Sequence, residues 1–528
     1  MADGRYPKPD LPNDAATSAT IPIVPIARIV TAIDHEDRRQ RSRSKESTIH
    51  NRANAERQEV MRPLLGNLLV SRTHLSALFV GLVALSTGLS DRLLAEDLAT
   101  HRVIGTAGCT ATSCHGGRSL IGGEATAWLT RDPAHRRAYD VLFNETSQRM
   151  AKQLGLKAAH TEARCLACHS TEASQPGVTH GERFAVEFGV GCESCHGAAG
   201  AWVAKHTERS WRTQSADSKS SLGFRDLRSL TVRAETCVAC HVGSPRATVD
   251  HDLIAAGHPR LAFEMSAYHD LLPKHWDAAA EQRRDPAQQV RLWAIGHGFS
   301  AKAMSDISVA RAEAAIKAGA KHVTPDLAEF DCQACHHDLT EPTRGRPTLR
   351  TSLGSPRWGS WTVAPARIAL RQSRSTFQSD GTAADASLER LLGLMQQSRI
   401  GTAPADTLLT TARQSSRELS TWAQSLDDSS TDAIQSQRLL RHLLANESAG
   451  DWSPTWDGQS QRYLAIVAVA QSTRQITGRE AFAPAGVAEV LPMLRKQLSY
   501  PRGYNTPRGF SASDVDRLLI ELRTHSTQ

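Results

Sequence analysis

The ten cysteines of this chain fall into five pairs, and a histidine follows the second cysteine of every pair. Four pairs have the spacing C-x-x-C-H, and the first has the wider spacing C-T-A-T-S-C-H. Histidine supplies only 22 of the 528 residues, so five such successors are not expected by chance and the histidine is part of the motif. The cysteines are Cys109, Cys114, Cys165, Cys168, Cys192, Cys195, Cys237, Cys240, Cys332 and Cys335, and the histidines are His115, His169, His196, His241 and His336.

The following histidine distinguishes between three chemistries. A zinc ribbon uses two cysteine pairs for each metal and needs no histidine next to them, and five pairs would leave one over. A thioredoxin-like dithiol uses a single pair in a β-α-β setting. A c-type haem needs two thiols for its two vinyl groups and an imidazole next in sequence for its iron. The sequence therefore predicts five covalently attached haems c, with the motif histidines as proximal iron ligands. The longer loop of the first pair can still span the two vinyl groups.

A low-spin haem iron also has a second axial ligand, and the chain holds further histidines that could provide it. His337 is too close to His336 to bind the same iron, and Met265 is a weaker candidate because imidazoles are abundant. We expect the distal ligands among His135, His206, His258, His251 and His180. The full set of ten histidines also includes His160, His269, His275, His297 and His322.

An apolar segment precedes the motifs. Residues 73–90 contain no charged side chain, and Arg62 and Arg72 lie before them. A basic flank, an apolar run and small residues are typical of a signal peptide, although a short membrane anchor has similar features. Because c-type haems are attached outside the cytoplasmic membrane, we expect a periplasmic or otherwise exported protein. Residues 61–90 would be its signal peptide, or an N-terminal anchor that associates with the membrane through residues 73–90.

The first sixty residues do not fit in front of an export signal. Residues 1–60 are polar, and Met61 could start translation directly before the basic flank. We therefore expect residues 1–60 to be a disordered extension or an untranslated segment. The arginine-rich run at residues 38–45 resembles nucleic-acid-binding segments, but we expect no nucleic-acid partner. The formal net charge of +7 also omits the negative propionates that bound haems would add.

The motifs lie within residues 105–342, which we expect to form a pentahaem cytochrome c domain. Only 5% of the chain is aromatic, which is little for a large conventional core, but porphyrins would supply apolar surface. Residues 343–361 have the Gly, Pro, Ser and Thr content of a linker. Residues 362–528 contain no cysteine and are predicted to form a helical domain of unknown role. The fold class is therefore mostly α, with much irregular loop around the haems.

Apolar residues recur at helical spacing in several stretches. Residues 285–297 and 308–322, which lie between the last two motifs, are helix-like. YLAIVAVA at residues 463–470 is either a buried helix or a buried strand. The C-terminal helical stripes are Leu388, Leu391, Leu392 and Met395; Leu408, Ala412, Leu419, Trp422 and Ala423; and Leu439, Leu440, Leu443 and Leu444.

Two segments carry a resemblance to a known family. The segment GVGCESCHGAAG at residues 189–200, followed by His206, and WLTRDPAHRRAY at residues 128–139 resemble the multihaem cytochrome c-552/4 family, which includes cytochrome c-554. The resemblance covers about residues 105–340. It implies a mostly helical fold with haems stacked in near-parallel and near-perpendicular pairs, and electron transfer between them. It also implies that His206 and His135 are distal ligands, although this chain has five sites where the best-known members have four.

Two functions fit these motifs. Electron transfer between redox partner proteins needs only closely packed haems, and nothing else in the chain requires further chemistry. An oxidoreductase that acts on a small nitrogen or sulfur compound would need a five-coordinate haem. The C-x-x-C-K motif typical of pentahaem nitrite reductases does not occur, and hydroxylamine oxidoreductases carry more haems. We therefore favour an electron carrier and predict no catalytic residue.

Overall fold

The structure is a computed structural model, and it describes most of the chain after residue 101. The predicted extension at residues 1–60 and the signal peptide or anchor at residues 61–90 lie outside the described residues, as does His337. None of the helices in the described part is long and apolar enough to cross a membrane. The described residues are 102–117, 123–171, 177–332, 335–336, 356–397, 402–445, 452–483, 485–499 and 510–526.

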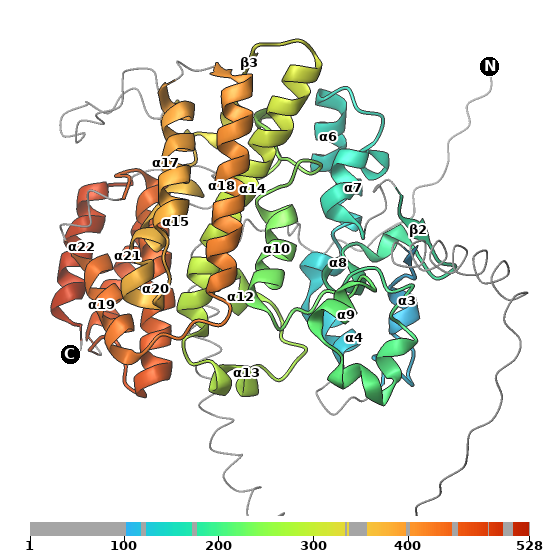
Figure 1. The fold of residues 1–528 in the computed structure, drawn as a ribbon, viewed down its shortest axis with the longest axis horizontal. Helices are drawn as coiled ribbons and strands as arrows, with labels where there is room; N and C mark the ends of the chain where they lie inside the picture. The colour runs from blue at the N-terminus through green and yellow to red at the C-terminus, as the bar shows by residue number, and fades with distance from the viewer. Residues whose placement is uncertain are drawn as a thin grey trace, which may run out of the picture.

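The N-terminal part consists of short helices joined by irregular loops (Figure 1). One small parallel pair of strands, β1 and β2, joins Arg102 to Thr179 and Val103 to His180. The elements are β1 (Arg102–Val103), α3 (Thr106–Cys109), α4 (Glu124–Thr126), η1 (Ala127–Arg131), α5 (Pro133–Arg136), η2 (Asp140–Phe143), α6 (Glu145–Gln153), η3 (Ala159–Thr161), α7 (Ala163–His169), β2 (Thr179–His180), η4 (Val186–Phe188), α8 (Cys192–His196), η5 (Lys205–Thr207), η6 (Arg209–Thr213), α9 (Ala216–Ser220), α10 (Leu230–His241), α11 (His251–Ala255), α12 (Met265–Leu271) and α13 (Ala278–Arg284).

The C-terminal part consists of longer helices, which confirms the predicted mostly α fold class. Its elements are α14 (Gln288–Lys317), β3 (His322–Val323), η7 (Leu327–Glu329), α15 (Val363–Arg371), α16 (Ser373–Phe377), α17 (Thr382–Gln397), β4 (Ala403–Pro404), α18 (Ala405–Ser425), α19 (Ala433–Leu444), α20 (Trp456–Thr477), η10 (Gly486–Val490), α21 (Leu491–Leu498) and α22 (Ala512–Thr524). The apolar stripes of the sequence form α17, α18 and α19, and residues 463–470 lie in the buried helix α20.

The longest helix, α14, joins the two helix-like stretches that the sequence predicts between the last two motifs. Ser300 and Ser305 lie between the two stretches and Ser308 begins the second one, and serines weaken a helical pattern. In the structure each of these hydroxyls donates a hydrogen bond to the carbonyl four residues earlier, at 2.7–2.9 Å. The serines are thereby satisfied within the helix itself. One continuous helix of 30 residues results.

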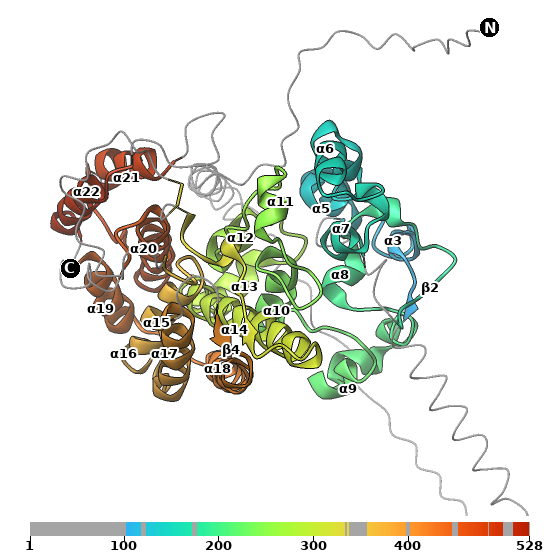
Figure 2. The same cartoon turned by 90° about the horizontal axis from the view of Figure 1, so that it is seen from above.

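Helix α14 lies in the middle of the molecule and is buried on several sides. It packs against α10 and α12 of the motif-bearing part and against α15, α18 and α20 of the C-terminal part. Figures 1 and 2 show it between the short blue-green helices and the orange-red helices. Gly298 permits a close approach to α18, because a Cβ atom there would lie 2.8 Å from the Trp422 ring. One cluster of buried apolar residues therefore includes residues from both parts of the chain, the first being Leu230 and the last Leu522.

This core crosses the predicted domain boundary. The predicted linker begins in residues that the structure does not describe, but its last residues, from Pro356 to Trp361, are described. Trp358 and Trp361 are buried at 1% and 4% exposure. The division of the chain into domains stays a prediction, but helices from both sides of the boundary share one core.

Leu419 lies in the interface between α18 and α14, and its side chain is fully buried. We expect Leu419→Ala to lower the free energy of unfolding by about 2–5 kcal/mol, because the substitution removes buried apolar contacts and leaves a cavity. Denaturant titration followed by circular dichroism measures this loss. Ile434→Ala, at a side chain 63% exposed, is the control and should change stability little. Equal effects of the two substitutions would contradict the packing described here.

Glu264 is a buried carboxylate at the N-terminus of α12. Its side chain is 2% exposed and accepts hydrogen bonds from the backbone of Ser266 at 3.0 Å and of Ala267 at 2.7 Å. Burial is the largest influence on this carboxyl, and it raises the pKa of Glu264 from 4.5 to about 7. The folded protein therefore holds a proton on Glu264 at pH values where the unfolded chain has released it.

A raised carboxyl pKa makes the folded state less stable as pH increases. Stability from Glu264 is fully present below pH about 4.5 and is lost as pH rises through about 7, a change of up to about 3 kcal/mol. Glu264→Gln should remove this dependence, so the variant should gain stability relative to the native protein across this window. Denaturant titrations at several pH values test this, and parallel stability curves for the two proteins would contradict it.

Candidate haem-binding sites

Three of the cysteine pairs lie on short helices that end at the motif histidine. These are α7, α8 and α10. The C-x-x-C spacing places the two cysteines three residues apart, on the same face of a helix, with the histidine one residue further. In the last motif a helical turn is closed by the backbone of His336, whose N–H donates to the carbonyl of Cys332 at 2.7 Å. In the first motif Cys109 ends α3, and the N–H of His115 donates back to its carbonyl at 3.2 Å. The wider first spacing is thus accommodated by a loop that returns the histidine to the first cysteine.

Each of the five motif histidines faces one other histidine across a similar gap. Ring centres lie 6.1–6.4 Å apart in all five pairs, although the partners come from different parts of the chain. The pairs, with the separation of ring centres and the angle between ring planes, are His115 with His206 (6.2 Å, 17°), His169 with His258 (6.4 Å, 86°), His196 with His275 (6.2 Å, 78°), His241 with His135 (6.1 Å, 76°) and His336 with His251 (6.4 Å, 26°).

This separation fits two imidazoles that bind one metal from opposite sides. A metal lies about 2 Å from an imidazole nitrogen that binds it and each nitrogen lies about 1 Å from its ring centre, so two such rings have centres about 6 Å apart. Direct stacking would bring the rings closer, as it does for His180 and Phe184 at 4.0 Å. The repeated spacing therefore leaves room for an iron between the rings of every pair.

The Nδ1 atoms of most of the facing histidines are already engaged. A ligand histidine normally uses its other nitrogen for such an outer hydrogen bond, which fixes the tautomer and leaves Nε2 for the metal. His275 is likewise hydrogen-bonded to the backbone of Pro273. The Nδ1 contacts are His135 with Asp132 at 2.7 Å, His206 with the Val203 carbonyl at 2.5 Å, His258 with the Pro259 carbonyl at 2.8 Å and, on a motif histidine, His169 with the Ala138 carbonyl at 2.7 Å.

The surroundings keep several of these imidazoles neutral, which is the form that binds a metal. Burial lowers the pKa of His196 and of His241 to about 4. Burial also lowers the pKa of His169 and of His258. His135 differs: burial acts to lower its pKa, but the hydrogen bond that its ring donates to Asp132 and the charge of that carboxylate raise it overall. A carboxylate on Nδ1 makes an imidazole a stronger donor to a metal.

The structure brings four of the five predicted distal candidates to a motif histidine, namely His135, His206, His251 and His258. It does not do so for His180, which lies in β2 with its ring stacked on Phe184. The ring of His275 stands in the remaining position, opposite His196. Sequence analysis included His275 among the ten histidines but not among the strongest candidates. A proline near the histidine in sequence could have indicated His275, because His258 and His275 are hydrogen-bonded to the backbone of Pro259 and Pro273, respectively.

The other described histidines have different surroundings. His160 stacks on Phe143 with ring centres 4.4 Å apart, and His269 is hydrogen-bonded to Arg233 at 2.7 Å. His297 is buried in α14, and His322 is paired with β4. Met265 is buried in the apolar core against Gly296. None of these five side chains faces a motif histidine within the part of the chain that the structure describes.

Neighbouring motifs touch one another in a definite order. The thiols of Cys109 and Cys192 are within hydrogen-bonding distance, as are those of Cys168 and Cys240. Helices α8 and α10 are also in contact. These contacts place the first motif beside the third, the third beside the fourth, and the fourth beside the second.

The fifth motif joins this series through α11. Its facing histidine, His251, is the first residue of α11, and Asp250 before it forms an ion pair with Arg164 at 2.8 Å. Arg164 directly precedes Cys165 of the second motif. The second and fifth motifs are therefore neighbours, and the spatial order of the five is first, third, fourth, second and fifth.

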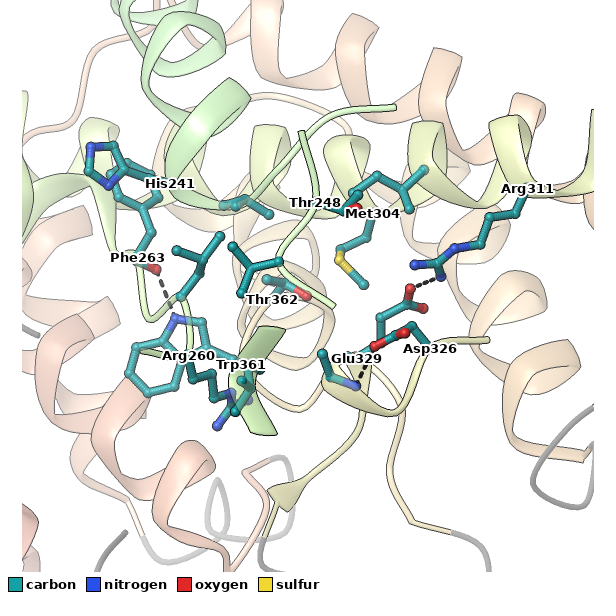
Figure 3. A pocket seen from close by; sticks show the side chains of 17 residues that line it. His241, Thr248, Arg260, Phe263, Met304, Arg311, Asp326, Glu329, Trp361 and Thr362 are labelled. Carbon is teal, nitrogen blue, oxygen red and sulfur yellow. Dashed lines mark hydrogen bonds and ion pairs between the residues drawn. The ribbon is translucent and has the colours of Figure 1, made fainter. Parts of the chain in front are cut away.

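A cavity lies between the fourth motif and the segment that leads to the fifth. Its empty space of about 660 Å³ includes a part that is open to solvent. Figure 3 shows His241 and Phe263 at one end of the cavity and Arg311 and Glu329 at the other. Arg260 and Trp361 line the same cavity. The two arginines of its lining are paired with carboxylates, Arg260 with Asp457 and Arg311 with Glu329.

A match to a known family agrees with this geometry. The match supports a resemblance to c-type cytochromes, a class of electron carriers that contain haem c. Residues 108–197, which hold the first three motifs, match the family described as cytochrome c554 and c-prime, and the chain resembles that family over this part. No curated protein and no solved structure matches the chain.

The ring angles predict the electron paramagnetic resonance spectrum of the oxidised protein. Near-parallel imidazole planes on a low-spin ferric haem give a rhombic signal, whereas near-perpendicular planes give a signal with one large g value. The pairs at 17° and 26° should give two rhombic signals, and the pairs at 76°, 78° and 86° should give three of the other kind. A high-spin signal that integrates to one haem would contradict the pairing.

Proposed function

We propose that this protein is an exported electron carrier with five covalently attached haems c, each held by two histidines. The observation that carries the proposal is the facing pair, which recurs at all five motifs with nearly the same ring separation. The paired cysteines would form the thioether bonds to each haem. The motif histidines His115, His169, His196, His241 and His336 would be the proximal ligands, and His206, His258, His275, His135 and His251, in the same order, the distal ligands.

This arrangement favours electron transfer over catalysis. The iron of a bound haem supplies reversible one-electron chemistry. The facing histidines would hold the iron from both sides, so a substrate would have to displace an imidazole before it could bind. The alternative, an oxidoreductase for a small nitrogen or sulfur compound, needs a motif histidine without a facing partner. All five motif histidines are described, and each has one.

The positions of the motifs support a path with two ends. Cys114 of the first motif and Cys335 of the fifth are exposed, whereas both cysteines of the three motifs between them are partly covered. The first and fifth motifs are also the ends of the spatial series. We place the contacts with the electron donor and acceptor at these two ends, and the second, third and fourth haems in the relay between them.

The proposed compartment follows from the attachment chemistry. Haem c is joined to exported chains, and the apolar segment at residues 73–90 has the composition of an export signal. Cleavage of this segment would release the carrier, and its retention would tether the carrier to the membrane. N-terminal sequencing of the native protein distinguishes these outcomes.

Carbon monoxide binding to the reduced protein tests the ligand assignments. Carbon monoxide needs an open axial position, so the native protein should show almost no change in its Soret band. His275→Ala should open one position and let about one haem in five bind carbon monoxide. His180→Ala is the matched control and should behave like the native protein.

Two outcomes of this experiment would contradict the proposal. Stoichiometric binding to one haem of the native protein would favour the oxidoreductase. Opening of a site by His180→Ala, with none opened by His275→Ala, would show that the third haem is bound by a different histidine.

A further inference from the structure

The C-terminal helices hold the helix of the fourth motif through a carboxylate. Asp427, at the end of α18, accepts hydrogen bonds from the N–H of Leu230 at 2.8 Å and the hydroxyl of Thr231 at 3.1 Å. The Ser229 hydroxyl also donates to it. These groups form the N-terminus of α10, where backbone N–H groups lack partners within the helix and a negative charge is favourable. The same helix carries Cys237 and Cys240 and ends at His241.

Helix α14 keeps Asp427 in place. Arg291 is 9% exposed and donates to the carbonyls of Leu426, Asp427 and Ser429 at 2.5–3.2 Å. The second terminal nitrogen of the Arg291 guanidinium, Nη2, forms an ion pair with Asp285. The turn after α18 is therefore fixed on α14 while its carboxylate faces α10. Helix α14 thus holds the turn after α18, and the Asp427 carboxylate of this turn holds the helix of the fourth motif.

A second carboxylate of the C-terminal part acts near the fifth motif. Asp457, at the start of α20, is 3% exposed and forms a two-pronged ion pair with Arg260 at 2.7 and 2.8 Å. The Ser360 hydroxyl donates to the same carboxylate at 2.5 Å. Arg260 and Asp457 are both close enough to act electrostatically on the Cys332 thiol. Figure 3 shows Arg260 beside Trp361, at the rim of the cavity that lies between the two motifs.

The backbone before Cys332 is braced by the segment that leads to Ser360. The N–H of Asp331 donates to the Arg357 carbonyl at 3.0 Å, and the N–H of Gly359 donates to the Glu329 carbonyl at 2.8 Å. Trp358 donates from its indole nitrogen to the Glu329 carboxylate at 2.7 Å. A continuous set of contacts therefore runs from the fifth motif through residues 357–360 to Asp457.

We propose that Asp427 is a positioning residue for the haem of the fourth motif and Asp457 for the haem of the fifth motif. The C-terminal helices are in this way part of the electron-transfer unit. Asp427 sets the position of α10 and so the angle between the His241 ring and His135. Asp457 holds Arg260 beside the fifth haem and offsets its charge. This inference rests on the proposed function, since it assumes five haems with two histidines each.

Redox titration separates an electrostatic role from a purely structural one. A positive charge near a haem favours the reduced iron, which carries one positive charge fewer. Asp457→Asn removes the negative charge that Arg260 faces, so one of the five midpoint potentials should rise. Arg260→Gln removes that positive charge, so the same potential should fall. Asp514→Asn, at an exposed ion pair of α22, is the control and should move none of the five.

Paramagnetic resonance of the oxidised variants assigns the effects to individual haems. Asp457→Asn should alter one of the two rhombic signals, since the fifth pair has near-parallel rings, and leave the other four signals unchanged. Asp427→Asn should instead shift one of the three signals with a large g value. If that substitution is silent because asparagine still caps α10, Asp427→Ala should produce the shift. Intact mass confirms beforehand that each variant carries its haems.

The outcomes separate this inference from the function on which it rests. A native protein without five low-spin signals would overturn the proposed function itself. With the native signals present, potentials that move in the same direction in Asp457→Asn and Arg260→Gln would contradict the positioning role. An equal change of all five haems in the Asp427 and Asp457 variants would likewise contradict it, and would assign these carboxylates to the folding of the whole chain.

Discussion

One geometric relation recurs at all five motifs: the ring centre of the motif histidine lies 6.1–6.4 Å from the ring centre of a second histidine. The motif fixes one histidine beside its two cysteines, but nothing in the covalent chain fixes the other. The second histidine of each pair lies 79 to 106 residues away in sequence, from His196 and His275 at the short end to His135 and His241 at the long end. Tertiary structure must therefore position each second histidine. Short helices and loops place its ring, and a hydrogen bond from Nδ1 to a backbone carbonyl orients the rings of His206 and His258. Two imidazoles around each iron, as proposed, would leave no coordination position open and would suit an electron carrier.

A second constraint is the central helix α14. The five cysteine-pair motifs lie within about 240 residues of mostly short helices and loops, and the second cluster of buried residues, around Tyr139 and Leu142, is small. The large core instead lies around α14 and is supplied mainly by the C-terminal helices. These helices thus provide the packed body against which the fourth and fifth motifs are held. Two of their carboxylates, the partly buried Asp427 and the buried Asp457, reach the motif-bearing segments from that body.

The sequence predicts much of this arrangement, to different extents. The cofactor and its attachment follow from local spacing, because thiols and imidazole must be adjacent to form one site. The C-terminal helices follow from apolar periodicity, which reports the buried face of α17, α18 and α19. The continuity of α14 was not predictable from periodicity, since its serines satisfy themselves on the helix backbone. The choice of His275 over His180 was not predictable either, because both lie in loop-like sequence and only the fold turns one ring toward His196 and the other onto Phe184.

The most direct test of the paired histidines is the crystal structure of the mature protein, with anomalous diffraction recorded at the iron absorption edge. The account predicts five iron peaks, each between the rings of one of the five pairs, with His275 opposite His196 and His251 opposite His336. An iron bound by a single histidine, or one bound on its distal side by His180, would contradict it.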